Sequence, residues 1–376
     1  MRKARWLGNP TNLTSKPVIF HCVSRVVDRR FVFAERECEA FRKFMRMYEN
    51  FSGCHVLSYC VMSNHFHLLL EVPPMAEGGL SDESLLKRLS ALYSEAFVAG
   101  VAVELVEARK TCIGEPRQAD EMAHAIEAGE AAAARAAEIH ARFAYRMHDL
   151  SQFMKGLLIR FTRWFNRTHS RTGTLWEERF KSVIVESGVA ARTIAAYIDL
   201  NPVRAGMVKD PADYRWSSYG EAVGGGAKGN GRKAREGLIR AYLGAQGVGF
   251  EMERWTEVSR LYRRLMGLGL GKKPGRAATN TTTNLGQTTL NTAEMLESDD
   301  NETVLKDLGM TKMLHCRVRY FTEGAVIGSK EFVNEAFAGA RDRFGAKRKD
   351  GARVMKGNGS GAKGTLWSLR DLRVGV

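Results

Sequence analysis

The 376-residue sequence has no apolar run long enough to cross a membrane, and no apolar core near its start that would suggest an export signal. Its six cysteines show neither the CxxC spacing of a zinc site nor the paired pattern of a secreted disulfide framework. Neither zinc nor a membrane span is therefore expected. Reduced thiols and the missing signal favour a cytoplasmic protein.

Positive charge, in contrast, is plentiful. Lysine and arginine number 57 against 42 aspartate and glutamate residues, which gives a formal net charge of +15. This balance favours a polyanionic partner, most simply nucleic acid, bound less tightly as salt rises. From Arg341 onward, ten basic and three acidic residues contribute +7 of the total. That tail is expected to bind phosphates without reading sequence, or else only to keep the chain soluble.

The hydrophobic pattern predicts an α+β domain over residues 1–220. Two strands are expected to flank a turn at Ser63-Asn64, and an amphipathic helix carries an apolar stripe of Phe153, Leu157, Phe161 and Trp164. The expected order β-α-β-β-α-β-α indicates helices packed on an antiparallel sheet. The ranges are strand 17–27, helix 35–51, strands 55–62 and 65–72, helix 150–166, strand 181–186 and a helix ending near residue 201.

Residues 74–149 interrupt this order with a helical insertion. A polar-capped helix begins at 80–89, and an alanine–glutamate stretch over 118–142 has good helix propensity. A solvated helical spacer is favoured, and a lid or a partner surface is also compatible.

Beyond the first domain the composition predicts four segments. These are a glycine-rich linker (221–235), a helical segment (236–270), a disordered linker (271–300) and a small C-terminal module with a basic tail (301–376).

The triplet His65-Phe66-His67 is the first candidate site. Two histidines at positions i and i+2 of a strand project from one face, where two imidazoles can bind a divalent metal. Imidazole and oxygen ligands together suit Mg²⁺ or Mn²⁺. The alternative is that both histidines are ordinary surface or packed residues.

A helix expected to begin after Ser187 is the second candidate. Pro202 is expected to stop it at Asn201, which places Tyr197 and Asn201 at positions i and i+4 on one face. A phenol and a carboxamide there can reach a metal-bound phosphate. A core tyrosine and a helix-capping asparagine are the alternatives.

Four segments in this order resemble the REP-associated tyrosine transposases, members of the single-tyrosine superfamily named for its histidine–hydrophobe–histidine (HUH) motif. The resemblance covers about residues 15–220. Its segments are His65-Phe66-His67, residues 173–182, residues 197–206 and Trp216-Ser-Ser-Tyr219.

This resemblance implies a ferredoxin-like fold, a metal held by His65 and His67, and Tyr197 as the nucleophile that forms a covalent 5′-phosphotyrosine. Asn201 stands where many relatives have a glutamine as third metal ligand. The implied substrate is single-stranded DNA with hairpin or palindromic repeats, in a prokaryotic, nucleoid-associated protein. A homodimer is left open, because one tyrosine per chain can serve two steps in either one or two subunits. A non-catalytic DNA-binding regulator and a metal-dependent hydrolase are the competing readings.

Basic residues near aromatic ones are candidates for DNA contact, because bases stack on rings while cations neutralise phosphates. A core position for Trp176 and Phe180, and simple solvation of the cations, are the alternatives. Trp216-Ser-Ser-Tyr219 is expected to pack the end of the domain. The candidate DNA-binding residues are Lys155, Arg160, Arg163, Arg167, Arg179 and Lys181.

Overall fold

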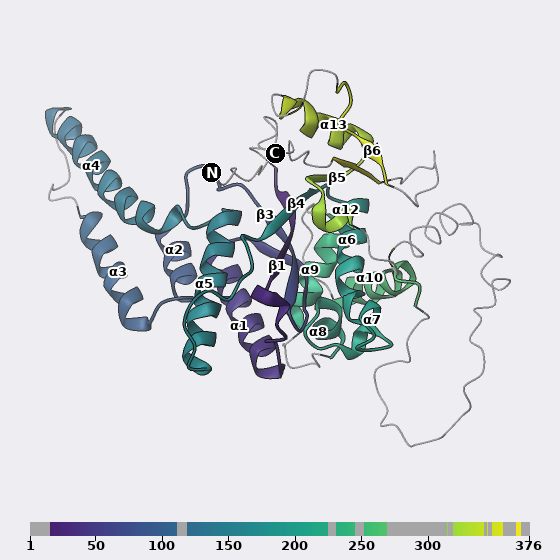
Figure 1. Cartoon of the computed structure of the whole chain (residues 1–376). Helices are drawn as coiled ribbons and strands as arrows, with labels where there is room; N and C mark the ends of the chain where they lie inside the picture. Colours follow the sequence, from purple (N-terminus) through teal and green to yellow (C-terminus); the bar gives the residue numbers. More distant parts are fainter. Residues whose placement is uncertain are drawn as a thin grey trace, which may run out of the picture. The chain divides into compact units, whose positions relative to one another are not determined.

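The computed structural model describes residues 16–110, 119–224, 231–244, 252–268, 314, 319–341, 344, 348–355 and 366–369 (Figure 1). The chain divides into two compact units, Met1–Ile184 and Val185–Val376. The linker predicted at 271–300 and residues 225–230 of the predicted glycine-rich linker lie outside the described residues, whereas residues 221–224 and 232–235 of that linker are helical. Across those ranges, no helix combines the length and apolar character of a membrane span.

The first unit contains a ferredoxin-like sheet. Its strands are β1 (Val18–Arg25), β2 (His55–Val61), β3 (His65–Val72) and β4 (Lys181–Val185), in the order β2-β3-β1-β4. Both β1 and β2 run antiparallel to β3. The Met62 amide donates to the His65 carbonyl at 2.8 Å, which closes the predicted two-residue turn between β2 and β3. The predicted α+β, ferredoxin-like fold is confirmed.

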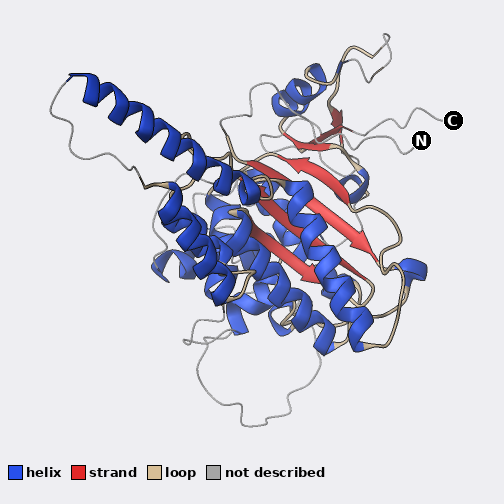
Figure 2. Cartoon of the chain, turned by 90° about the vertical axis from the view of Figure 1, so that its left-hand side faces the viewer, coloured by secondary structure: helices blue, strands red, loops and turns tan. Residues whose placement is uncertain are grey.

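Two helices, α1 (Glu35–Ser52) and α5 (Leu150–Thr168), cover one face of this sheet. In Figure 2, helices lie in front of the red strands. The ring centroids of Phe41 and Phe66 are 4.5 Å apart, and those of Phe41 and Phe161 are 5.3 Å apart. Trp176 joins the same aromatic core and donates from Nε1 to Thr162 Oγ1 at 2.9 Å. The apolar stripe of α5 therefore faces the sheet, as its 3–4 spacing predicts.

The described residues of the insertion form three helices, α2 (Asp82–Leu89), α3 (Glu95–Ala108) and α4 (Ala119–Ala144). In Figure 1, α3 and α4 project as an arm. The side chains of Ser81 and Ser94 accept hydrogen bonds from backbone amides and so cap α2 and α3. The predicted helical character is confirmed.

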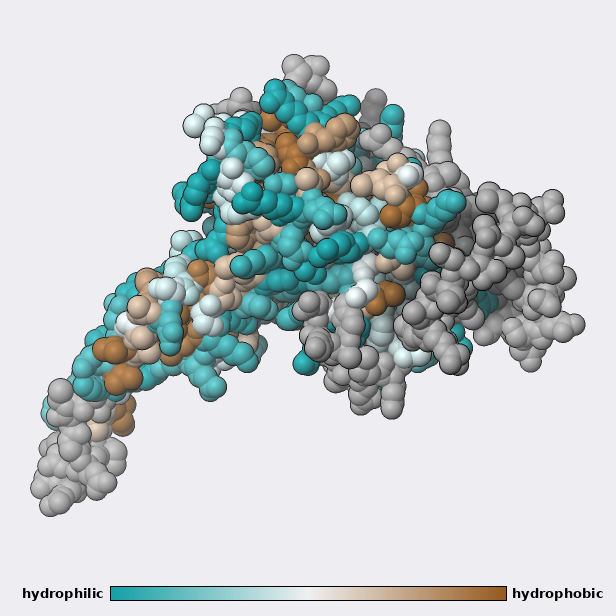
Figure 3. All heavy atoms as spheres, turned by 90° about the horizontal axis from the view of Figure 1, so that it is seen from below, coloured by the Kyte–Doolittle hydropathy of each residue, from teal (hydrophilic) through white to brown (hydrophobic). Residues whose placement is uncertain are grey.

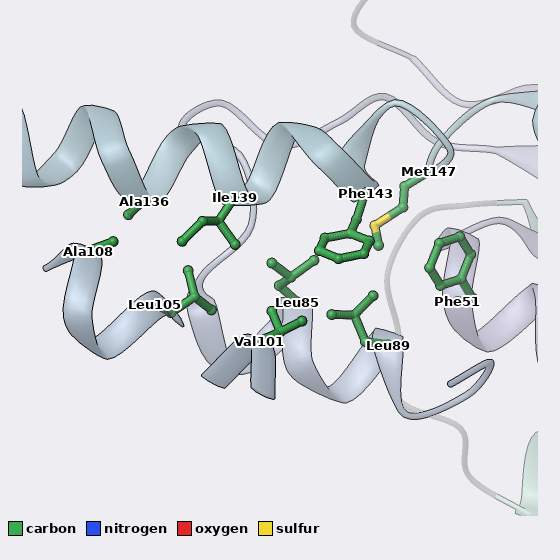
Figure 4. Packing of buried hydrophobic residues seen from close by; sticks show 10 residues of the cluster. All are labelled: Phe51, Leu85, Leu89, Val101, Leu105, Ala108, Ala136, Ile139, Phe143 and Met147. Carbon is green, nitrogen blue, oxygen red and sulfur yellow. The ribbon is translucent and has the colours of Figure 1, made fainter. Parts of the chain in front are cut away.

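A hydrophobic core of its own fills this insertion (Figure 4). Leu85 and Leu89 of α2 meet Leu105 of α3 and Phe143 of α4, and Phe51 of α1 anchors the cluster to the sheet domain. The expectation of a solvated spacer is wrong on this point, because the apolar positions of α3 and α4 pack against each other. Some apolar side chains nevertheless remain exposed on the arm, as the brown patches in Figure 3 show; they include Val103, Val106 and Ile126.

The second unit begins with a helical body. It contains α6 (Val189–Asp199), α7 (Asn201–Arg204), α8 (Ser218–Gly224), α9 (Arg232–Leu243) and α10 (Met252–Leu265). The buried Asp199 carboxylate accepts from the Tyr219 amide at 2.8 Å and from the Tyr262 hydroxyl at 2.7 Å. Burial raises the pKa of Tyr262, which keeps its hydroxyl protonated as a donor. The helical segment predicted at 236–270 thus packs on α6, and Trp216-Ser-Ser-Tyr219 packs as predicted.

The described part of the C-terminal module contains α12 (Tyr320–Glu323), β5 (Val326–Gly328), α13 (Lys330–Ala338), β6 (Arg353–Val354) and β7 (Trp367–Leu369). Both β5 and β6 run antiparallel to β7. The Glu186 carboxylate accepts from the Ser329 amide at 2.6 Å and from its hydroxyl at 2.9 Å, which ties the module to the chain that follows β4.

Candidate active site: a histidine strand and a tyrosine helix

His65 and His67 project from the same face of β3, as predicted. Their partners on β1 are Arg25 and Val23, and their ring centroids lie 5.2 Å apart. Phe66 between them points into the core under α1. The strand alternation therefore places the two imidazoles on the face opposite to the α1–α5 layer.

Each histidine makes a hydrogen bond through Nδ1. His65 Nδ1 lies 2.7 Å from Asn64 Oδ1, and His67 Nδ1 lies 3.0 Å from Nε2 of His21 on β1. His21 is 0% exposed and His67 is 4% exposed, and their rings stack with a centroid distance of 5.2 Å. Neither His21 nor Asn64 emerged from the sequence. The sequence signal that could have identified His21 is its polar imidazole in the middle of an otherwise apolar strand.

The donor chemistry of the histidine pair fits a divalent metal. An Nδ1 hydrogen bond of this kind commonly sets the tautomer of a metal-ligating histidine, which leaves Nε2 with the lone pair. Within the residues that the structure describes, no group of three or more histidine, cysteine, aspartate or glutamate side chains could hold a metal. Further ligands for these two imidazoles would have to be amide, water or substrate oxygens, which Mg²⁺ and Mn²⁺ accept.

Two cysteines near this strand are buried and reduced. Cys60 lies on β2 opposite His67, and Cys54 directly precedes β2. Burial raises the pKa of the Cys54 thiol to about 12. A protonated thiol at neutral pH is a poor metal ligand.

The tyrosine helix differs from prediction at both ends. Gly188, with a φ of 80°, precedes α6, and no side chain caps it, so Ser187 is not the N-cap. The helix ends at Asp199, and Asn201 begins the short helix α7. Pro202 lies in the first turn of α7 instead of stopping α6, because a missing amide costs nothing at that position.

Arg204 joins Tyr197 to Asn201. Its Nη2 donates to the Tyr197 carbonyl at 2.7 Å and to Asn201 Oδ1 at 2.6 Å. Its guanidinium carbon lies 4.0 Å from the centre of the Tyr197 ring, and Phe321 meets the same ring edge-on at 4.8 Å. Tyr197 is only 3% exposed, while Asn201 Nδ2 is buried with no hydrogen-bond partner in the described structure. The sequence signal that could have identified Arg204 is its position three residues after Asn201, because residues at i and i+3 are neighbours on a helix surface.

The candidate DNA-binding residues of α5 are not equivalent. Lys155, Arg163 and Arg167 are exposed on the outer side of the helix, which the α1–α5 layer and the sheet separate from the histidine face. Arg160 is half-buried over the Phe44 and Tyr48 rings, so packing accounts for its position.

Arg179 and Lys181, at the start of β4, are exposed, and Lys181 pairs with Glu178 at 3.1 Å. Phe180 between them is buried, which confirms the core alternative for this ring. Trp176 is half-buried and packs edge-on against Phe66 of the core.

The structure therefore brings together His65 with His67 and Tyr197 with Asn201. The first pair belongs to the first unit and the second pair to the second unit. That the two pairs form one site stays a prediction.

Comparison with known proteins agrees with the sequence motifs. Residues 14–81, which include both histidines of β3, match the family model described as IS200-like transposase. No curated protein matches the chain in sequence. Among solved structures, the chain is similar to a REP-associated tyrosine transposase bound to a REP hairpin, with 13% identity, a TM-score of 0.33, and coverage of 61% of this chain and 88% of that one. The resemblance to a transposase is confirmed by the family match, which falls on the first unit.

Proposed function

We propose that this protein is a transposase-like DNA strand transferase that cleaves and rejoins single-stranded DNA at hairpin or palindromic repeats. The observation that carries the proposal is the pair of His65 and His67, which share one face of β3 inside the segment matched by IS200-like transposases. The net charge of +15 supports a DNA partner.

In the proposed reaction the phenol oxygen of Tyr197 attacks the scissile phosphate. A bond from tyrosine oxygen to phosphorus forms, the bond from phosphorus to the 3′-oxygen breaks, and the phenol proton ends on the released 3′-hydroxyl. The covalent 5′-phosphotyrosine conserves the bond energy, so a 3′-hydroxyl can attack it to rejoin a strand. Atoms and charges balance without an oxidant or a second substrate.

His65 and His67, through Nε2, and Asn201, through Oδ1, would hold Mg²⁺ or Mn²⁺. A bound divalent ion acts as a Lewis acid toward the phosphate. A carboxamide oxygen has two lone pairs, so Asn201 can accept from Arg204 and still offer the second. Arg204 holds this arrangement in place, because its Nη1 donates to the Leu314 carbonyl at 2.7 Å while its Nη2 donates to the Tyr197 carbonyl and to Asn201 Oδ1.

A non-catalytic DNA-binding regulator derived from a transposase is the second candidate function. The 3% exposure of Tyr197 favours it, since a ring covered by Arg204 and Phe321 is also what a core tyrosine looks like. Under the leading proposal, this cover must move aside when DNA binds.

One experiment separates the candidates. The full chain and its Tyr197→Phe variant are incubated with labelled, hairpin-flanked single-stranded DNA and Mn²⁺, and the products are resolved on a denaturing gel. Tyr214→Phe is the matched control, because Tyr214 is another buried tyrosine of the same unit. Strand transfer predicts a covalent adduct in the wild type and in the control, and none in Tyr197→Phe.

Other outcomes favour other functions. Cleavage that survives in Tyr197→Phe would indicate a hydrolase with water as nucleophile. Binding of the hairpin without cleavage by the wild type would indicate the regulator.

A further inference from the structure

We propose that Asn64 and His21 are positioning residues, which set the ring tautomers of His65 and His67 so that both present an Nε2 lone pair on one face of β3. This inference rests on the proposed function, in which that face holds the metal. Asn64 and His21 touch neither metal nor phosphate in this scheme, and they act through the histidines beside them.

The Asn64 contacts determine the His65 tautomer. Asn64 Nδ2 donates to the Arg29 carbonyl at 3.0 Å, while its Oδ1 lies 2.7 Å from His65 Nδ1. A flipped amide would set oxygen against the Arg29 carbonyl oxygen, so only one orientation satisfies that contact. Because a carboxamide oxygen only accepts, His65 Nδ1 must carry the proton. The lone pair of a neutral His65 ring is then on Nε2.

The Arg29 carbonyl is itself held in place. It lies in a 3₁₀ turn (Val27–Arg29) where Asp28 and Arg29 have φ angles of 57° and 54°, a left-handed conformation that costs free energy in non-glycine residues. Two backbone hydrogen bonds tie this loop to the hairpin turn, from the Val26 amide to the Asn64 carbonyl at 2.9 Å and from the Val32 amide to the Ser63 carbonyl at 3.0 Å. The loop after β1 therefore fixes the acceptor that orients Asn64.

His21 does for His67 what Asn64 does for His65. Val23 is the β1 partner of His67, so His21, two residues earlier, projects from the same face. The His21 and His67 rings lie within 19° of parallel, with 3.0 Å between His21 Nε2 and His67 Nδ1. Either nitrogen can be the donor in this hydrogen bond. We assign the proton to His67 Nδ1, because only that arrangement leaves the His67 lone pair on Nε2 for the metal of the proposed function. His21 Nε2 is then the acceptor, as Asn64 Oδ1 is for His65.

A third metal ligand is the competing role for His21. The His21 Nε2 points at His67 Nδ1 and not at His67 Nε2, which is the nitrogen that faces the metal in this scheme. Among the described residues, no cluster of three histidine, cysteine, aspartate or glutamate side chains could hold a metal. The geometry therefore assigns His21 to support rather than ligation. Outer partners of this kind typically change metal affinity by about 10–100-fold when removed.

The test measures the tautomers of His65 and His67 and the affinity for Mn²⁺ in the full chain. Long-range ¹H–¹⁵N spectra of the metal-free, histidine-labelled protein report which nitrogen of His65 and His67 is protonated, and Mn²⁺ titration followed by electron paramagnetic resonance reports affinity. The variants are Asn64→Leu and His21→Phe, which remove the acceptors of the two Nδ1 protons. Controls are Asn50→Leu, on the exposed side of α1, and His55→Phe, opposite Glu71 at the other end of the sheet.

We expect protonated Nδ1 on both histidines of the wild type. Asn64→Leu and His21→Phe should each weaken Mn²⁺ binding by about 10–100-fold, and the controls should bind like the wild type. A wild-type proton on Nε2 of His65 or His67 would overturn the inference, as would folded variants with unchanged affinity. If Asn64→Leu or His21→Phe fails to fold, the wild-type tautomers decide. Predicted tautomers and affinities in a protein that forms no DNA adduct would support the positioning role and contradict the proposed function.

Discussion

The two halves of the proposed site are built in opposite ways. On the histidine strand, His65 and His67 are each oriented by a hydrogen bond to a residue with no part in the chemistry, and β-pairing sets their common face. On the tyrosine helix, Tyr197 lies under Arg204 and Phe321. At the start of the next helix, the buried amide nitrogen of Asn201 has no hydrogen-bond partner among the residues that the structure describes.

This difference indicates how the two halves would work. A metal pair gains from rigidity, because ordered ligands lose little entropy when an ion binds. A nucleophile must reach a bulky polyanion, so its cover has to open, and a buried polar atom without a partner is a local free-energy cost that rearrangement can relieve. We therefore expect changes on the histidine strand to act on metal affinity, and changes around the tyrosine helix to act on packing and access.

The largest expected effect follows from removing one ligand. His67→Ala should lower Mn²⁺ affinity by more than about 100-fold, beyond the range for losing an outer partner, and should abolish adduct formation. Calorimetric Mn²⁺ titration measures the first effect and a denaturing gel the second. An adduct formed at the wild-type rate by His67→Ala would break the link between the histidine strand and catalysis.

A smaller effect is expected from the packing behind the tyrosine helix. Tyr262→Phe removes the donor to buried Asp199 and should lower the free energy of unfolding by about 1.5–3 kcal/mol, the usual range for a hydrogen bond to a charged group. Urea denaturation measures the change. Tyr145→Phe, on an exposed ring of the insertion, serves as the control and should have no effect.

The insertion makes the stability of the fold depend on pH, through residues that belong to neither half of the proposed site. Hydrogen bonding from Arg109 lowers the pKa of Asp82 from 3.8 to about 2, with a further contribution from His140. A carboxylate with a lowered folded pKa stabilises the fold above pH 4, and this contribution is lost as the pH falls toward 2. After solvent screening we expect about 1 kcal/mol. The free energy of unfolding of the wild type and of Asp82→Asn is measured from pH 7 to pH 2. The difference between the two proteins should shrink as the pH falls, and a constant difference would contradict the lowered pKa of Asp82.

The smallest single effects are expected from the exposed cations of α5. If Arg163 and Arg167 each contact a phosphate, the double alanine variant should reduce the slope of log affinity against log salt by about 2. Fluorescence anisotropy of a labelled hairpin at several salt concentrations measures this slope. An unchanged slope would restrict DNA contact to other surfaces, such as that of Arg179 at the start of β4.

Much of the first unit could be predicted from sequence because its periodicities are local. Alternation over β1 and β3 and the 3–4 stripe of α5 predicted the strands, the helix and the shared face of His65 and His67. The partnership of His21 with His67 could not be predicted, since it depends on the register between strands 46 residues apart. The end of α6 was also missed, because Pro202 is compatible both with stopping one helix and with starting the next.

The core of the insertion was missed for a related reason. Alanine-rich α4 has high helix propensity in isolation, and the charges on its surface indicated a solvated helix. Its packing against α3, in one cluster with Leu105, becomes visible only when distant segments are placed together.

The central claim, that Tyr197 forms a covalent bond to DNA, is tested most directly by mass spectrometry of the trapped adduct. The full chain is allowed to react with hairpin-flanked single-stranded DNA and Mn²⁺, then digested with nuclease and protease, and the nucleotide-bearing peptide is sequenced. We predict a 5′-phosphate linkage on Tyr197. A linkage on any other residue, or DNA cleavage with no protein-linked nucleotide, would contradict the claim.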